Sequence, residues 1–551
     1  MLGFPRQPCI LLDGLCSKPE LNGLEVQMVS ANKGGRWGVI PCGRTRCSAT
    51  GINPFSVSHA NLRVDGCGHA EGQGREVRLH GLRSQPELNG KIGRCQYFWA
   101  EKQRWSITLE EKTGKKSIMV KSAQIQDISN GNVLVDPVRT ETRLILGQEH
   151  QCLVASMPLH PGDVVFKETP ILTTPTLEGK GEHAEHAFYE QLAKAVKSYL
   201  ALPSETRAAI CTLSADESFS WGLVQDPTCI LGHSHTRELQ ITDVMKGLSD
   251  AGCCVQATDE QEVWTFVRMW KRNSFAVGVK PQSMSALYLW SSRANHSCDP
   301  NVRSSDLPSG VSVLVAIKPI SVGEEICVSY LNDWKLLEPA DRRRRHLAPW
   351  FSECECLRCQ CTTEEPFRGL RCVETDGCTG LRRHAHGTFQ ACSQCGDETP
   401  PDEAEMVLKR ELELVEGYEV MEQNLMGVGR DGGRLLRECM EQAEYFFPPS
   451  HWLVARYHDM LADFEKECGN LSAALVHRLA VLSFFDAHLQ RPSLRRAFIL
   501  EEVATWQHRH GERLDAVKNC SRALEELSVM LPPEHKWCTE ARETLKATLS
   551  V

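Results

Sequence analysis

Three short stretches near the middle of the chain constrain its fold more than any other part. They are Arg293-Ala-Asn-His-Ser-Cys-Asp-Pro-Asn301, Gly323-Glu-Glu-Ile-Cys-Val-Ser-Tyr330 and Cys354-x-Cys356-x-x-Cys359. The first predicts an irregular loop ending at a proline, which its surroundings must hold in place. The second alternates like a strand, and the third has the close cysteine spacing of a metal site. Each stretch alone is a weak signal, but their order and spacing together are specific.

Together these stretches resemble the core of the SET-domain protein lysine methyltransferases, most closely the branch that normally carries a MYND zinc finger. The resemblance covers about residues 138–551 and is strongest over 288–360. It implies an α+β multidomain chain. Its parts are a β-rich SET domain over 138–350 with a helical insertion at about 180–260, a post-SET and zinc-ribbon-like segment over 351–398, and a helical domain over 402–551. The implied function is S-adenosylmethionine-dependent N-methylation of lysine in a protein substrate, histone or non-histone.

The resemblance also implies roles for individual residues. Tyr330 matches the catalytic tyrosine, which would orient a neutral lysine amine for in-line methyl transfer at ~3–3.5 Å and favour the charge shared in the transition state. The alternative for Tyr330 is a strand tyrosine that only packs. Asn273 would touch the cofactor or, alternatively, terminate a helix. The complete set implied to contact S-adenosylmethionine is Asn273, Ser292, Asn295, His296, Tyr330 and Phe351.

Two departures from the family motivate a second hypothesis. The family's Gly-x-Gly, which lets the backbone approach the cofactor because glycine has no Cβ, is replaced here by His150-Gln-Cys152. The insertion lacks paired Cys-x-x-Cys units, so we expect no MYND finger. The alternative function is therefore a catalytically weak SET protein that acts as a protein-interaction scaffold.

The cysteines predict two zinc ions. By resemblance, Cys298 completes a set with the three thiols of the third stretch, and Cys361 is the alternative fourth ligand. A zinc-ribbon-like set follows, in which His384 and His386 are alternatives to its second cysteine. Four-coordinate cysteine sites leave no open position, so both roles would be structural. The predicted ligands are Cys298, Cys354, Cys356, Cys359, Cys372, Cys378, Cys392 and Cys395.

The N-terminal third contains an internal repeat. Leu12-Asp-Gly-Leu-Cys-Ser-Lys-Pro-Glu-Leu-Asn-Gly23 is nearly repeated at Leu79-His-Gly-Leu-Arg-Ser-Gln-Pro-Glu-Leu-Asn-Gly90. Short alternating runs between turn residues predict two SH3-like β-barrels, over 7–66 and 74–128. Trp37 and Trp105 occupy corresponding positions. They are either core residues of spacer or docking barrels, or part of an aromatic peptide-reading surface.

The C-terminal region reads as helix pairs. Gly469-Asn-Leu-Ser-Ala-Ala474 and Gly511-Glu-Arg-Leu-Asp-Ala516 look alike, and each follows a stretch with helical periodicity. Such pairs resemble tetratricopeptide repeats, which stack into concave surfaces. We therefore expect protein docking through the N-terminal barrels and this helical tail, unless the tail only stabilises the SET core.

Composition limits the remaining alternatives. The net charge of −9 argues against direct nucleic-acid binding, so a zinc-dependent nucleic-acid binder is the least favoured reading. No secretory signal or membrane-length apolar run is visible. The 25 cysteines, clustered in a chain without such a signal, favour metal sites in a reducing compartment, the nucleus and/or the cytoplasm. The basic run Arg342–Arg345 is a nuclear address, a patch for an acidic partner or a solvated helix face.

Overall fold

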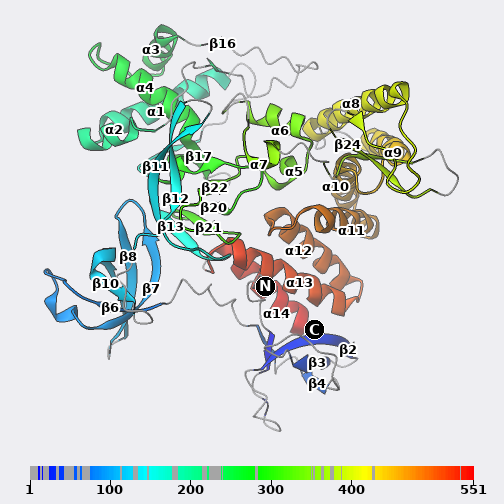
Figure 1. The fold of residues 1–551 in the computed structure, drawn as a ribbon, viewed down its shortest axis with the longest axis horizontal. Coiled ribbons are helices and arrows are strands. Elements are labelled where there is room, and N and C mark those ends of the chain that lie inside the picture. Colours follow the sequence, from blue (N-terminus) through cyan, green and yellow to red (C-terminus); the bar gives the residue numbers. More distant parts are fainter. Residues whose placement is uncertain are drawn as a thin grey trace. The chain divides into compact units, whose positions relative to one another are not determined.

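The computed structural model divides the chain into two compact units. The central unit is His69–Ser329, and the terminal unit combines Met1–Gly68 with Tyr330–Val551 (Figure 1). The described residues are 10–12, 15, 24–32, 36–41, 55–58, 62–64, 75–111, 114–127, 135–145, 148–176, 184–213, 220–221, 237–238, 240–278, 283–348, 350, 354–360, 365, 367–372, 378–385, 388–424, 429–533 and 535–550.

An eight-stranded sheet forms the frame of the central unit. Six strands follow the order β10-β6-β7-β13-β21-β20, while β8 pairs with β7 and β9 with β8. The apolar run from Val313 to Val315 is almost completely buried in β21, as expected for a strand covered on both faces. The strands are β6 (Glu76–Leu79), β7 (Ile92–Trp99), β8 (Arg104–Glu111), β9 (Gly114–Val120), β10 (Ile125–Asp127), β13 (Val164–Glu168), β20 (Val302–Asp306) and β21 (Ser312–Ala316).

Strand β7 joins the second sequence repeat to the rest of this sheet. It pairs in parallel with β13 at Trp99 and Lys167. The backbone N–H of Ala100 donates to the carbonyl oxygen of Lys167 at 3.0 Å. The ammonium group of Lys167 lies 4.0 Å from the ring centroid of Tyr97, a cation–π distance. The repeat predicted as a separate barrel over 74–128 thus shares its sheet with strands of the domain that follows.

The rest of the central unit comprises small sheets and a helical insertion. Helix α1 buries Leu192, Ala195 and Tyr199 on one face, and Tyr199 stacks on Phe266 of α4 at 4.1 Å. The elements are the hairpin β11 (Val138–Ile145) and β12 (Gln148–Ala155); the sheet β14 (Leu172–Pro175), β18 (Met284–Leu287) and β17 (Ser274–Val277); the pair β15 (Ser220–Trp221) and β16 (Arg237–Glu238); the pair β19 (Asn295–His296) and β22 (Cys327–Val328); and helices α1 (Ala184–Leu200), α2 (Ser204–Ile210), α3 (Ile241–Asp250) and α4 (Glu260–Asn273).

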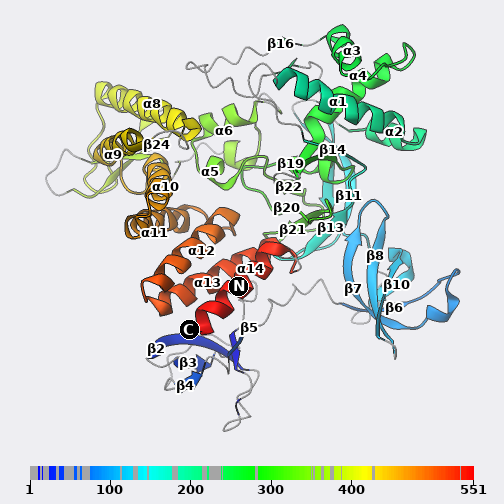
Figure 2. The same cartoon turned by 180° about the vertical axis from the view of Figure 1, so that it is seen from behind.

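The first sequence repeat lies in the terminal unit as a five-stranded antiparallel sheet. Its order is β4-β3-β2-β1-β5, with β1 (Ile10–Leu12), β2 (Glu25–Asn32), β3 (Arg36–Pro41), β4 (Phe55–Ser58) and β5 (Leu62–Val64). Figures 1 and 2 both place these strands beside α14 (Lys536–Ser550), and β2 also contacts α13 (Arg513–Met530). The SH3-like closure of either repeat stays a prediction.

The corresponding tryptophans of the two repeats are both buried. Trp37 is fully buried and donates its indole N–H to the carbonyl oxygen of Leu549 at 3.1 Å, while the Arg513 guanidinium lies 5.0 Å from its ring. Trp105 instead donates to the Ser122 hydroxyl, inside its own repeat, at 3.0 Å. Both side chains are core residues, and the first repeat uses its indole to bind the C-terminal helix.

Helices make up most of the terminal unit. Gly469 and Gly511 both adopt positive φ, at 79° and 83°, in the turns that follow α10 and α12. These turns confirm that the two similar segments predicted from sequence join helix pairs in the same way. The elements are α5 (Asp333–Leu336), α6 (Ala340–Leu347), α7 (Leu357–Gln360), β23 (Gly369–Arg371), β24 (Leu381–Ala385), β25 (Thr388–Phe389), α8 (Pro401–Asn424), α9 (Gly429–Phe446), α10 (Trp452–Glu467), α11 (Leu471–His488) and α12 (Leu494–Arg509). No described helix has the length and hydropathy to cross a membrane.

Candidate functional site

A short parallel ladder in the central unit brings the first two sequence motifs together. Asn295 of β19 pairs with Cys327 of β22, and His296 pairs with Val328. The backbone N–H of Ser297 donates to the carbonyl oxygen of Val328 at 2.8 Å. The Asn-His pair is therefore fixed against a strand whose last residue, Val328, is two residues before Tyr330 in the sequence. The sequence motifs alone do not show this pairing.

Two asparagines of the first motif clamp the second motif through their side chains. The Asn301 amide accepts from the Cys327 N–H at 2.9 Å and donates to the carbonyl oxygen of Glu325 at 2.8 Å. The Asn295 amide donates to the Glu325 carboxylate at 2.8 Å. Because Asn301 is 8% exposed, its bonds are shielded from water. Asn301 is quoted in the motif but was not predicted as a site residue, and its role here is to position the ladder.

The unusual segment His150-Gln-Cys152 lies on β12 and reaches this same ladder. The Asn295 amide also donates to the Cys152 sulfur at 3.1 Å. Cys152 is fully buried, and burial, followed by the nearby Glu325 carboxylate, raises the pKa of its thiol to about 11. The thiol is therefore neutral at physiological pH. The position that departs from the family's glycine pattern is in direct contact with Asn295.

Glu168 is a site residue that the sequence prediction missed. It ends β13, is 1% exposed, and accepts hydrogen bonds from the backbone N–H groups of Leu289, Trp290 and Ser291 at 2.7–2.8 Å. The Ser291 hydroxyl donates to it at 2.9 Å. Burial raises the pKa of Glu168, while these donors oppose the shift. One carboxylate thus organises the turn that leads into Ser292 and the Asn-His pair. The Glu168-Thr-Pro170 sequence is the only signal that could have indicated it.

Asn273 and Ser292 lie next to each other. Asn273 is the last residue of α4, is buried, and donates its side-chain amide to the Met269 carbonyl at 2.9 Å. The Ser292 hydroxyl donates to the Asn273 carbonyl at 3.4 Å. Asn273 ends its helix and its side chain bonds within that helix, which agrees with the alternative prediction of a helix-terminating asparagine. Its proposed cofactor contact stays a prediction.

Tyr330 is the residue at which the chain, after strand β22 of the ladder, enters the terminal unit. Its ring lies 5.6 Å from the ring of Trp350, at an interplanar angle of 48°. The side chain is half-buried. Phe351, which was predicted to contact the cofactor, falls outside the described residues.

The first predicted zinc set contributes three thiols within the terminal unit. The sulfurs of Cys354, Cys356 and Cys359 lie within 4.8 Å of one another. The buried Arg343 guanidinium is 3.7 Å from the Cys359 sulfur. Arg342 is also buried and pairs with Glu338 at 2.9 Å, so half of the basic run is neither a solvated face nor an exposed address. In the central unit, Cys298 is buried with its sulfur 3.3 Å from His296 Nε2.

The second predicted zinc set is complete in the terminal unit. The sulfurs of Cys372, Cys378, Cys392 and Cys395 lie within 4.8 Å of one another. Backbone N–H groups, led by that of Cys395, lower the pKa of the Cys392 thiol to about 6, which favours the thiolate that zinc requires. A Cβ added at Gly380 would approach the Cys392 sulfur to 2.3 Å. Four soft, converging thiols fit Zn²⁺.

Two histidines, His384 and His386, were predicted as alternative ligands of this second zinc set. The described His384 packs its ring edge-on to Phe389 at 5.1 Å, and Cys378 takes the fourth position as predicted. His386 and the other alternative ligand, Cys361, lie outside the described residues. Among the described residues of the insertion, no three metal-ligating side chains converge. The expected lack of a MYND finger stays a prediction.

Zinc analysis of the purified chain should find about two ions per molecule. Cys392→Ser should lower this to about one, because it removes a ligand from a closed four-thiol site. Cys468→Ser, an exposed cysteine outside both sets, should leave it unchanged. Plasma mass spectrometry after extensive dialysis measures the ratio, and a wild-type chain without zinc would contradict both sites.

The chain is similar to proteins of known family over part of its length. Residues 150–331 match the SET domain family model. The chain is 25% identical over 293 residues to protein-lysine N-methyltransferase SMYD4 of Danio rerio, covering 47% of this chain and 38% of the relative. It is 28% identical over 225 residues to histone-lysine N-methyltransferase SET9 of Yarrowia lipolytica, covering 40% and 21%. To human histone-lysine N-methyltransferase SMYD3 it is 41% identical over 76 residues, covering 13% and 17%.

These matches span about two fifths or less of the relatives' own lengths. They establish a SET domain in this chain, with SMYD-type and SET proteins as its relatives. The N-terminal repeats lie outside the SET-domain match.

Proposed function

We propose that this SET-domain chain is a protein lysine N-methyltransferase that uses S-adenosylmethionine. One observation carries the proposal: the Asn295–His296 strand is paired with Cys327–Val328, which ends two residues before Tyr330. This ladder lies inside the match to the SET domain, and it fixes the polar loop against the strand that leads to Tyr330. The names of the relatives, protein-lysine and histone-lysine methyltransferases, support the same reaction.

The groups on the ladder have a chemistry that suits this methyl donor. The donor has a polar amino-acid end and, when bound, supplies a methyl group on a positively charged sulfur. The half-buried side chains of Ser292, Asn295 and His296 offer hydrogen-bonding groups on a loop that Glu168 and Asn301 hold rigid. We assign these three residues, with Asn273 and Phe351, to donor binding. Rigid positioning of this kind supplies much of the rate in a transfer that needs only alignment.

Tyr330 is assigned to the lysine. Its hydroxyl would orient the neutral amine and favour positive charge as it develops on nitrogen. The lysine must arrive without its proton, and a site that excludes water lowers the pKa of a lysine amine in the required direction. The substrate is a protein, and the relatives named for histones make a histone lysine one candidate.

Zinc is assigned a structural part in this proposal. Cys298 is proposed as the fourth ligand of the set containing Cys354, Cys356 and Cys359, and its burial beside His296 supports this role. A closed thiolate site at that point would fix the loop carrying the Asn-His pair. The second set would stabilise the segment between the SET domain and the helices.

The scaffold hypothesis keeps one specific observation in its favour. Cys152 and Glu325 both take hydrogen bonds from the Asn295 amide nitrogen, so this group is already engaged within the protein. A chain whose donor site is partly self-satisfied would bind S-adenosylmethionine weakly and act through its surfaces.

Transfer of a labelled methyl group separates the two functions. The purified chain is incubated with S-adenosylmethionine carrying a trideuterated methyl group and with a mixture of core histones and other cellular proteins. Peptide mass spectrometry then locates the label. Trideuterated methyl on lysine Nζ supports the enzyme, whereas the absence of any labelled lysine, together with weak or undetectable donor binding, supports the scaffold.

A further inference from the structure

A cavity of about 700 Å³ opens in the helical region of the terminal unit. Residues of α10, α11, α12 and α14 line it, among them Phe498, Trp506, Glu501 and Glu540. Its size is that of a site for a side chain or small ligand. Nothing in the methyltransferase proposal uses it.

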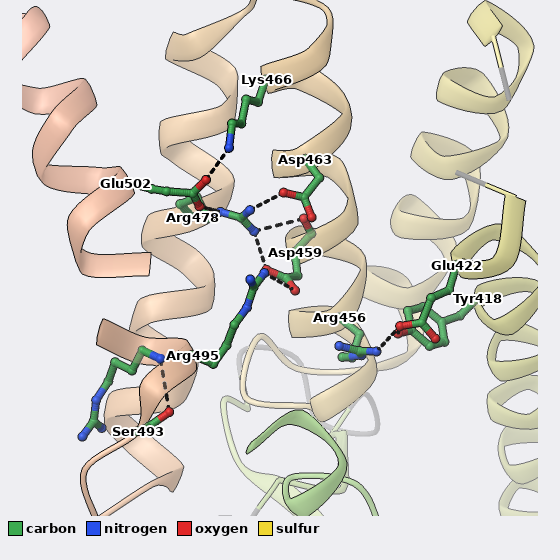
Figure 3. Close-up of polar contacts among 11 residues, drawn as sticks. Tyr418, Glu422, Arg456, Asp459, Asp463, Lys466, Arg478, Ser493, Arg495 and Glu502 are labelled. Atoms are coloured by element: carbon green, nitrogen blue, oxygen red, sulfur yellow. Dashed lines mark hydrogen bonds and ion pairs between the residues drawn. The ribbon is translucent and has the colours of Figure 1, made fainter. Parts of the chain in front are cut away.

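Two cations that line the cavity are already neutralised within the protein. Figure 3 shows Lys466 directed at Glu502, at 2.5 Å, and Arg495 directed at Asp459, at 2.7 Å. The Glu502 carboxylate also forms an ion pair with Nε of the buried Arg478 at 2.8 Å. These charges form one closed network. Because Lys466, Arg495 and Glu502 are already paired within it, they are poorly available to bind a charged ligand.

Two other glutamates that line the cavity, Glu501 and Glu540, are not part of that network. Within the described part of the chain, neither carboxylate has an ion pair with a cation. Burial, followed by the charge of Glu540, raises the pKa of Glu501 to about 7. Two carboxylates that repel each other at a cavity wall are stabilised when a cation is placed between them. A third cation, Arg509, also lines the cavity, so Glu501 and Glu540 together leave an excess of one negative charge outside the closed network.

Aromatic rings supply the second half of a cation site. Trp506 is 4% exposed, and Phe498, half-buried, packs edge-on to Trp537 at 5.0 Å. The stem of a lysine or arginine side chain packs well on such rings, and its cationic end is attracted to their faces. A planar guanidinium can also bind a carboxylate through two parallel hydrogen bonds.

We propose that this cavity is a docking site for a basic peptide segment of a partner protein, with an arginine or lysine side chain inserted between Glu501 and Glu540. Charge complementarity selects this occupant over an acidic or neutral one. None of the residues that line the cavity is assigned to methyl transfer, so the proposal stands whether or not the chain is an active methyltransferase.

Fluorescence anisotropy with the full-length chain tests the site. The probe is fluorescein-labelled triarginine amide, and its comparison is the tricitrulline analogue, which has nearly the same shape without charge. Triarginine should bind at least about tenfold more tightly than tricitrulline, because an ion pair in a partly desolvated site contributes about 1.4 kcal/mol or more. Glu501→Gln and Glu540→Gln should each weaken triarginine binding severalfold, and the double variant should remove the preference for charge.

Glu543→Gln is the matched control, since Glu543 is an exposed glutamate on the same helix as Glu540 that does not line the cavity. It removes the same charge and should leave the affinity unchanged. Glu501→Gln should also melt no lower than wild type at pH 8, because a carboxyl whose pKa is raised loses stability as pH rises through about 7. Equal binding of triarginine and tricitrulline, or equal losses in Glu540→Gln and Glu543→Gln, would overturn the proposal.

Discussion

Replacing Tyr330 with phenylalanine should lower methyl transfer by about 100-fold and leave the affinity for S-adenosylmethionine within about twofold. Removing one preorganised hydrogen-bonding group that acts on the transition state costs about this much. The ring itself remains, so its packing 5.6 Å from Trp350 is preserved and the fold should not change. Single-turnover transfer of a labelled methyl group, together with calorimetric titration of the donor, measures the two quantities separately.

Tyr445→Phe provides the control for this result. Tyr445 is 77% exposed on α9, far in sequence from the SET domain, and loses the same hydroxyl. Its transfer rate should match wild type. If Tyr330→Phe transferred methyl groups as fast as wild type, Tyr330 would be a packing residue and the catalytic assignment would be wrong.

Glu168→Ala should lower the free energy of unfolding of the protein by more than about 3 kcal/mol. Hydrogen bonds to a charged group contribute roughly 1.5–3 kcal/mol, and each buried donor left unpaired costs about 1–3 kcal/mol. The variant leaves the N–H groups of Leu289, Trp290 and Ser291 without their acceptor in a site that is almost completely buried. Urea denaturation followed by tryptophan fluorescence reports the change, since Trp290 lies in the affected turn.

Glu190→Ala is the comparison for Glu168→Ala. Glu190 is a partly exposed glutamate on α1 whose carboxylate pairs with Lys194 at 3.0 Å, and this pair is exposed. Such pairs contribute less than about 1 kcal/mol. Equal denaturation midpoints for the two alanine variants would show that Glu168 does not organise the turn.

Local patterns in the sequence predicted much of this architecture. The turns at Gly469 and Gly511 and the four-cysteine set around Cys392 all depend on residues close together in the chain. Turn chemistry, strand alternation and metal-ligand spacing are signals that a sequence carries directly. The resemblance to SET domains then connected the local pieces into one order.

Contacts between distant residues were the part that the sequence could not supply. Glu168 bonds residues 121–123 positions away, and the Asn295 amide reaches Cys152, 143 positions away. The pairing of β7 with β13, which merges a predicted barrel with the next domain, is another such contact. Nothing in the composition of either partner segment specifies which distant segment it will meet.

Those distant contacts also change how the missing glycines are interpreted. At the sequence level, His150-Gln-Cys152 is a departure at one edge of the expected donor site. In the folded chain, the Cys152 thiol is a hydrogen-bonding partner of Asn295, and the Glu325 carboxylate is the other partner of the same amide. Whether this arrangement admits the donor is the central question for the proposed activity.

Calorimetric titration of the purified chain with S-adenosylmethionine answers that question without requiring the protein substrate. The methyltransferase account predicts saturable binding with about one donor per chain, weakened by Asn295→Ala and retained in Tyr330→Phe. Absence of heat of binding at millimolar donor, in a chain that carries its zinc and melts cooperatively, would contradict the account and leave the scaffold function in its place.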